Sequence, residues 1–347
     1  LFAASQTLYR SGQVTKAFDL LGQVITYSSN QGKYNNILAL WSLEQRAPDV
    51  ALQFLNYSLN QDYKEALLTT AIAQSESRNI GQALAAWDSV RQHGDTTQLQ
   101  MAESMTRVLI IPQRVVSGLS EEEKYAFCRY RLSPADTLAL KSIIALMKDE
   151  DLKARAIFDM TEKLYRIDET DAAIRTFQKI KGLKLRDKKL YEDIQHLELL
   201  MLAKKNDLRA LASQINTGIE FKDDRKNEKI YFTALISASS GDQQNAVKNF
   251  EWLATANPYF EDALVASAYY LKEYSKENLK AYKILVEALQ VNPKSVKILK
   301  AYSIEAATNG FDDYAQAALV RLGPLIPEAS FRKFMLDNQQ AFSSLSF

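Results

Sequence analysis

Two stretches near the C-terminal end share one pattern: AVKNFEWLATANP at 246–258 and AYKILVEALQVNP at 281–293. Each begins with alanine, carries a large apolar residue four positions later and ends in proline. A third, more divergent copy places Ala315, Leu319 and Pro327 in the same order. The alanines and the prolines both recur at intervals of 35 and 34 residues. A fixed period of this length indicates repeated supersecondary units.

The residue types at these positions suit a pair of packed helices. A small side chain lets two helices approach closely, and a larger residue one turn later fills the remaining space between them. Proline lacks a backbone N–H and disfavours helix in the residue before it, so it ends the second helix. Such a pair cannot bury its apolar face alone and must stack on a neighbouring pair.

Weaker copies of the pattern extend toward the N-terminus. Their small residues are Ala17, Ala51, Ala83, Ala173 and Ala210. The interval of 90 residues between Ala83 and Ala173 fits neither two nor three repeats. Residues 97–150 are therefore expected to form irregular helix pairs, with a break between two helices at Ser133-Pro134.

The period and the small-residue positions resemble those of the tetratricopeptide repeat, whose unit is about 34 residues long. The resemblance covers most of the chain, and a related family of helical repeats is the alternative. It implies an all-α fold, a right-handed superhelical α-solenoid of about eight to nine antiparallel helix pairs. We expect TPR-like repeats in residues 1–96, irregular helical pairs in 97–150, and TPR-like repeats with a capping helix in 151–347.

The composition favours helices and argues against nucleic-acid binding by net charge, a membrane span and an internal disulfide. The 347 residues include 11 glycines and 7 prolines, where average usage would give about 24 and 17. Lys plus Arg is 43 and Asp plus Glu is 42, so no net field attracts nucleic acid or an anionic membrane. No apolar run approaches the ~18 to 20 residues that a membrane span needs. The single cysteine, Cys128, excludes an internal disulfide.

No catalytic motif is apparent, so we predict no catalytic residue, no cofactor and no metal site. The sequence lacks a Gly-rich phosphate loop, a nucleophile elbow and a His-Glu-x-x-His pair. His93 and His196 should lie on different helix pairs, and the aromatic neighbours of Cys128 favour a buried structural thiol. The acidic run after Ser120 is typical of a capped helix start. The basic segment 181–190 favours a solvated loop, with a contact patch for an acidic partner as the alternative.

The resemblance also implies where a partner would bind. In tetratricopeptide arrays the first helix of each pair lines the inner groove, so counting back from the small residue of each second helix gives candidate contacts. These candidates are Arg155, Phe158, Tyr165, Arg166, Gln195, Tyr231, Lys297 and Lys300. The positions that hold a peptide C-terminal carboxylate in chaperone-binding members fall on Phe2, Gln6, Asn36 and Leu40, which argues against that use.

These features predict a non-catalytic scaffold for protein–protein interaction that binds a partner segment in its groove. The alternative is a helical arm of an envelope enzyme whose catalytic domain lies outside this sequence. RNA-binding repeats need a basic groove, and the charge balance disfavours them.

The first ten residues already have the pattern of an amphipathic helix, so we expect the sequence to be part of a longer protein. We also expect a bacterial origin, and the periplasm or cell envelope is favoured over the cytoplasm. The terminal helix near Phe331 to Phe342 is a candidate for self-association.

Overall fold

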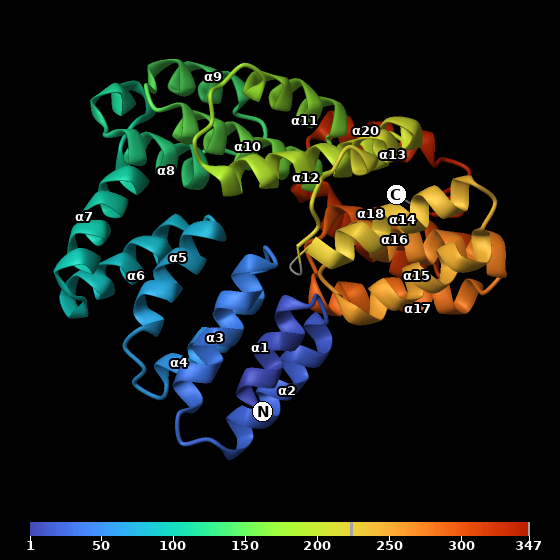
Figure 1. Cartoon of the computed structure of the whole chain (residues 1–347), viewed down its shortest axis with the longest axis horizontal. Helices are drawn as coiled ribbons and strands as arrows, with labels where there is room; N and C mark the ends of the chain where they lie inside the picture. Colours follow the sequence, from blue (N-terminus) through green and yellow to red (C-terminus); the bar gives the residue numbers. More distant parts are fainter. Residues whose placement is uncertain (223–224, 346–347) are drawn as a thin grey trace. The chain divides into compact units, whose positions relative to one another are not determined.

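The computed structural model of the protein describes residues 1–222 and 225–345 (Figure 1). Residues 223–224 and 346–347, which fall in the predicted C-terminal block, lie outside the described residues. The described residues form helices and no β-strand, which confirms the predicted all-α fold of repeated helix pairs. None of their helices combines the length and the apolar character that crossing a membrane requires.

The helical elements have these bounds: α1 (Phe2–Arg10), α2 (Val14–Tyr27), α3 (Gln31–Glu44), α4 (Pro48–Leu59), α5 (Ala66–Glu76), α6 (Ile80–His93), α7 (Thr96–Ile110), η1 (Gln113–Gly118), α8 (Glu121–Arg131), α9 (Thr137–Leu146), α10 (Glu150–Arg166), α11 (Thr170–Phe177), η2 (Gln178–Ile180), α12 (Lys188–Lys204), α13 (Leu208–Asn216), α14 (Lys226–Ser239), α15 (Gln243–Ala256), α16 (Glu261–Tyr270), η4 (Leu271–Ser275), α17 (Asn278–Val291), α18 (Val296–Thr308), α19 (Asp312–Leu322), η5 (Gly323–Leu325) and α20 (Glu328–Asp337).

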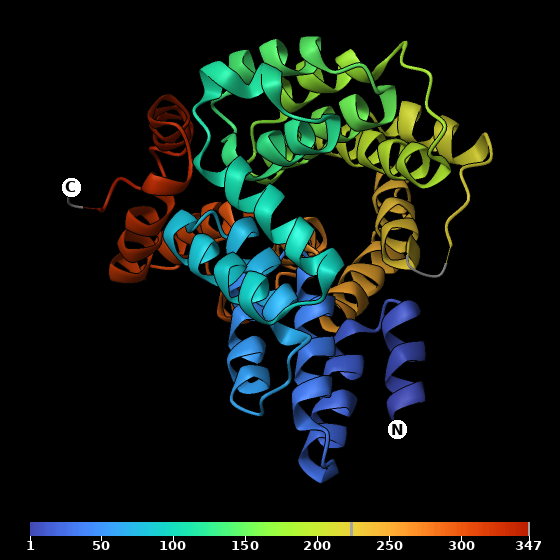
Figure 2. The same ribbon diagram turned by 90° about the vertical axis from the view of Figure 1, so that its left-hand side faces the viewer.

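The chain forms two compact units. Unit 1 comprises Leu1–Phe2, Phe18–Lys163 and Ala173–Ile194, and unit 2 comprises Ala3–Ala17, Leu164–Ala172 and Gln195–Phe347. In unit 1 the pairs α3–α4 and α5–α6 pack on each other, and α3 runs beside α4 in both views (Figure 1, Figure 2). In unit 2 the pairs α14–α15, α16–α17 and α18–α19 stack in chain order.

A residue with positive φ stands at the corner between the two helices of a pair. In the described part of the chain these corner residues are Gly12, Arg46, Arg78, Asp168, Asn206, Gly241, Lys276 and Gly310. After six of these corners the N–H of the next residue bonds to a carbonyl five residues back, as in Phe311 to Ala306 at 2.8 Å. This is the Schellman arrangement, which satisfies the last carbonyls of the first helix and turns the chain into the second.

Several second helices begin with a side-chain cap immediately after the corner. Asn79 accepts the N–H of Gln82 at 3.4 Å, and Asp207 accepts the N–H of Ala210 at 3.1 Å. Such caps satisfy one of the N–H groups that a helix start leaves without a partner. The corner and the cap together therefore fix the residue at which the second helix begins.

The predicted small-residue position lies five residues after each corner and is fully buried in every pair. The residues at this position are Ala17, Ala51, Ala83, Ala173, Leu211, Ala246, Ala281 and Ala315. The prediction was wrong by one residue in the pair α12–α13, where Leu211 is buried and Ala210 is partly exposed. The corner at Asn206 and the cap at Asp207 set the phase of α13, so position rather than side-chain size decides which residue faces α12.

The large residue predicted four positions later is also buried. Leu21, Leu55, Trp87, Phe177, Phe250, Leu285 and Leu319 all lie in the core. Trp87 additionally donates its indole N–H to the hydroxyl of Ser75 at 3.0 Å. Full burial of a side chain of this size stabilises the fold by about 1.5–3 kcal/mol, so these residues supply much of the contact within and between pairs.

One pair contains an extra residue at the end of its first helix. α16 continues into the π-helical turn η4, and the N–H of Glu277 bonds to the carbonyl of Leu271 at 3.1 Å, six residues back instead of five. In the neighbouring pair the buried small residue of the first helix, Ala234, precedes Ala246 by 12 residues. The extra residue moves this position to Ala268 and leaves Tyr269 54% exposed.

The regular alternation of first and second helices breaks between α6 and α10. α7 is followed by the short 3-10 segment η1 instead of a second α-helix, and a break at residues 132–136 separates α8 from α9. Ser120 caps α8 as expected, because it accepts the N–H of Glu123 at 3.2 Å while the Glu123 carboxylate accepts the N–H of Ser120 at 2.9 Å.

Carboxylates of this region hold backbone N–H groups of later segments. Glu121 accepts the N–H groups of Lys148 at 2.6 Å and of Asp149 at 3.0 Å. Its hydrogen bond from the Lys124 ammonium, together with these backbone bonds, lowers the pKa of Glu121 to about 2. The ionised form of Glu121 therefore anchors the start of α10 to the start of α8.

The basic segment 181–190 is anchored in the same way. Glu150 accepts the N–H of Lys184 at 2.9 Å, and Asp151 accepts the N–H of Arg186 at 2.9 Å. The guanidinium of Arg186 lies 3.5 Å from Asp151. The predicted loop is thus present before α12, and acidic residues of α10 position its backbone.

Replacing Ala246 or Ala281 by arginine tests the repeat register. Ala246→Arg and Ala281→Arg each force a charge into a close helix contact, so each should destabilise by several kcal/mol. Gln244→Arg places the same side chain on the exposed face of α15 and should change the free energy of unfolding by less than about 0.5 kcal/mol. Urea unfolding measures all three, and near-native stability of both alanine variants would refute the register.

The lowered pKa of Glu121 predicts a loss of stability in acid. Its carboxyl has a lower pKa in the folded than in the unfolded state, so its contribution is present above pH ~4.5 and is lost as pH falls toward about 2. Urea unfolding at pH 6 and pH 3 should show a smaller acid loss in Glu121→Gln than in the wild type. The exposed neighbour supplies the control, since Glu122→Gln should keep the wild-type difference.

Candidate functional site

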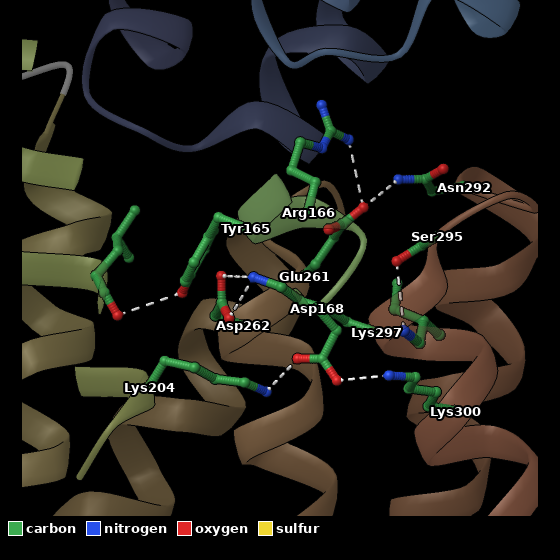
Figure 3. Close-up of polar contacts among 12 residues, drawn as sticks. Tyr165, Arg166, Asp168, Lys204, Glu261, Asp262, Asn292, Ser295, Lys297 and Lys300 are labelled. Atoms are coloured by element: carbon green, nitrogen blue, oxygen red, sulfur yellow. Dashed lines mark hydrogen bonds and ion pairs between the residues drawn. The ribbon is translucent and has the colours of Figure 1, made fainter. Parts of the chain in front are cut away.

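The candidate contact residues fall in both units. Arg155 and Phe158 lie in unit 1, while Tyr165, Arg166, Gln195, Tyr231, Lys297 and Lys300 lie in unit 2. In unit 1, Arg155 forms an ion pair with Asp187, and Phe158 is half-buried. In unit 2 the structure brings Tyr165, Arg166, Lys297 and Lys300 together at one site (Figure 3).

The corner between α10 and α11 forms one side of this site. We call residues 165–168, Tyr-Arg-Ile-Asp, the α10–α11 corner. α10 ends at Arg166, and Asp168 takes the left-handed conformation with φ of 65°. The N–H of Glu169 bonds back to the carbonyl of Leu164 at 2.9 Å. The corner faces residues from α12, α16 and α18, which are the first helices of three later pairs (Figure 3).

Asp168 lies between two lysines that come from different helices. Its Oδ1 is 2.9 Å from the Nζ of Lys204 at the end of α12, and its Oδ2 is 2.8 Å from the Nζ of Lys300 in α18. Burial acts to raise the pKa of Asp168, but the two ammonium groups outweigh it and the pKa lies below its ordinary value. Burial likewise opposes the charge of Lys204, and Asp168 outweighs it and raises the pKa of Lys204. The carboxylate is therefore ionised and paired at neutral pH.

Lys297 is buried at the centre of the same site. Its Nζ lies 2.8 and 2.9 Å from the two carboxylate oxygens of Asp262 and 3.4 Å from the centre of the Tyr165 ring. Only 3% of its side chain is exposed. Burial lowers the pKa of Lys297, and Asp262 opposes this shift. A cation over an aromatic face is attracted by the negative face of the ring, so Tyr165 covers the ammonium group on the side that Asp262 leaves open.

The hydroxyl of Tyr165 completes the contact with α12. It donates to the carbonyl of Leu200 at 3.4 Å. Burial, followed by the nearby charge of Asp262, raises the pKa of Tyr165 well above its ordinary value. The phenol is therefore a neutral hydrogen-bond donor at physiological pH.

Arg166 and Ile167, the two middle residues of the corner, contact a carboxylate and a group of apolar side chains, respectively. The guanidinium of Arg166 lies 3.3 Å from Glu261 Oε1, which also accepts a 2.9 Å hydrogen bond from the side chain of Asn292. Ile167 packs against an apolar cluster built from residues of α16 to α20. The four consecutive residues of the corner thus present an aromatic ring, a cation, an aliphatic side chain and a carboxylate, and each has a matching contact.

The remaining predicted residues lie outside these contacts. Tyr231 is buried in an aromatic cluster, with its ring centre 5.1 Å from that of Phe260. Gln195 is half-buried and lies one residue before the groove position that the Leu211 register assigns to α12. That position is His196, whose Nδ1 is 2.7 Å from a carboxylate oxygen of Glu228.

The acidic partners and Lys204 were missed by the sequence analysis. Counting back along the first helices does not reach Asp168, which stands at a corner, or Asp262, which begins α16. The usable signal was the corner itself, because an aspartate stands where three other pairs have glycine and four have arginine, asparagine or lysine. Which lysines it meets depends on contacts between pairs up to 132 residues apart.

The reactive side chains of the described residues are placed as structural groups. Cys128 is buried, and burial raises its pKa to about 12, which keeps the thiol protonated. His93 is exposed at the end of α6, whereas His196 is buried in α12, so the two lie on different pairs as predicted. Among the described residues, no three His, Cys, Asp or Glu side chains gather as metal ligands could.

Comparison with protein-family models finds no match, and comparison with curated proteins finds none either. Among solved structures, the crystal structure of the TPR domain of P58(IPK) is similar at 15% sequence identity. The match covers 98% of this chain and 97% of that chain, with a TM-score of 0.28. A likeness at this score carries no information about function.

Removing Lys297 tests the energetic importance of the site. Lys297→Met leaves Asp262 buried without its counter-ion and should destabilise by about 3–5 kcal/mol. Lys283→Met is the matched control, because that lysine is 75% exposed and its pair with Glu287 should contribute less than about 0.5 kcal/mol. Chemical unfolding measures both variants. In the double variant Lys297→Met, Asp262→Asn, part of the lost stability should return, and equal losses in the two lysine variants would contradict the assignment.

Proposed function

We propose that the protein is a TPR-like scaffold that binds a segment of a partner protein on the first-helix faces of its pairs. One observation carries the proposal: the first helices α12, α16 and α18 of unit 2 already hold a short segment, residues 165–168, by side-chain contacts. Charge-assisted hydrogen bonds, cation–π contact and apolar packing are the means by which proteins recognise peptides.

The candidate contact residues differ in what they offer a partner. Phe158 and Gln195 are half-buried, and Arg155 and Arg166 expose 41% and 30% of their side chains. We propose Phe158, Gln195 and Arg155 as direct contacts, whereas Arg166 belongs to the segment 165–168 that the first helices already hold. Tyr231 and Lys297 are buried, so we propose that they position the groove, and the buried Tyr165 is part of the segment that they face. Lys300 joins the two groups, because it pairs with Asp168 and retains partial exposure.

Site-specific photo-crosslinking tests this proposal. The photoreactive residue p-benzoylphenylalanine is placed at Phe158 and Gln195, on first helices, and separately at Tyr27 and Tyr57, which are 87% and 64% exposed on the second helices α2 and α4. In extracts of the source cells, illumination should yield a discrete protein adduct from the first-helix positions. Adducts that form equally well at Tyr27 and Tyr57 would overturn the proposed binding face, and a lack of adducts at Phe158 and Gln195 would overturn the proposed function.

A further inference from the structure

We propose that the α10–α11 corner occupies the binding groove of unit 2 as an internal stand-in for the partner. The groove would then recognise a short segment that carries an aromatic, a basic, an aliphatic and an acidic residue in that order, as residues 165–168 do. The inference rests on the proposed function and specifies the ligand that the same site would take.

The turn of the chain does not require the side chain of Asp168. Gly12, Gly241 and Gly310 form the equivalent corner in other pairs without any side chain. A positive φ is costly for most L-residues, although aspartate tolerates it better than most. The carboxylate at this corner is therefore explained by its contacts with Lys204 and Lys300 rather than by the geometry of the turn.

The surface that receives the corner defines what a ligand must supply. Without the corner, Lys204 and Lys300 would lose the carboxylate that now lies between their ammonium groups. Glu261 would keep Asn292 but lose its contact with a guanidinium. A ligand must therefore bring a carboxylate for the two lysines and, two residues before it, a cation for Glu261.

Lys297 sets the third requirement. The pair with Asp262 belongs to the receiving surface and remains when the corner leaves. The ammonium group is then open on the side that the Tyr165 ring now covers at 3.4 Å. An aromatic residue directly before the basic one restores this cover, and an aliphatic residue in the place of Ile167 packs against the apolar cluster of α16 to α20.

The resident corner should make the intact protein bind such a segment weakly. A tethered segment is present at a high effective concentration and competes with any free peptide. Two of the contacts that hold it are polar and partly exposed, since Lys204 and Arg166 expose 36% and 30% of their side chains, whereas Tyr165 and Lys297 are buried. Weakening the corner should therefore raise the affinity for a free peptide, because the binding-competent state becomes more populated.

Peptide binding tests the inference with the full chain. The probe is a fluorescein-labelled peptide of residues 161–172, TEKLYRIDETDA, followed by fluorescence anisotropy. We expect weak binding to the wild type and at least tenfold tighter binding to Asp168→Asn. Adding Lys300→Gln to that variant should abolish the gain. A control peptide with asparagine in place of its corner aspartate should show no gain with Asp168→Asn.

A milder variant protects the test against loss of folding. Arg166→Gln weakens the corner through a 3.3 Å contact and leaves the Asp168 pairs intact, so it should also tighten peptide binding. Circular dichroism and the unfolding midpoint establish that each variant is folded. The inference is overturned if a folded variant binds the acidic peptide no better than the wild type does, or no better than it binds the control peptide.

The peptide-binding experiment and the crosslinking experiment can fail independently of each other. A native partner that crosslinks at Phe158 while the peptide fails to bind the corner variants would remove only the internal stand-in. Peptide binding that depends on Lys300, without any native adduct at the first-helix positions, would support the groove chemistry and remove the proposed cellular role.

Discussion

The close approach of the two helices in each pair governs the described structure. In the pairs α3–α4, α5–α6 and α14–α15, an alanine of the first helix and an alanine of the second lie in the same buried cluster, as Ala234 and Ala246 do. A larger side chain at such a contact would separate the helices and expose the apolar residues one turn away. The corner with positive φ keeps the buried residue of the second helix facing the first helix, because this residue always lies five positions after the corner.

Charged residues link helix pairs that are far apart in sequence. In unit 1 the corner residue Arg46 lies 3.0 Å from Glu162 of α10, and in unit 2 the corner residue Asp168 bonds to Lys300 of α18. Stacking alone would let each pair contact only its neighbours. These ion pairs add fixed contacts inside each unit, and in unit 2 they make the first-helix face a set of matched donors, acceptors and rings.

The sequence revealed the repeat better than it revealed the site. Alanines at a regular spacing located the buried positions, but Leu211 was missed because a small residue stood directly before it. The π-helical turn η4 went unnoticed because its extra residue leaves the spacing of the alanines near 35. Counting along first helices selected Tyr165 and Lys297, which contact each other, yet it could not select Asp168, Lys204 or Asp262. Their roles depend on which pairs meet across long stretches of chain, and a local pattern does not contain that information.

The contacts of the α10–α11 corner also determine how unit 2 would respond to mechanical force. The helices from α11 to α17 lie between Asp168 and Lys300 in the chain. A pull on these two points would load the ion pairs first, since the intervening helices carry no tension until the pairs separate. Unit 2 should consequently resist stretching up to the force that separates these ion pairs, and it should then lengthen one helix pair at a time.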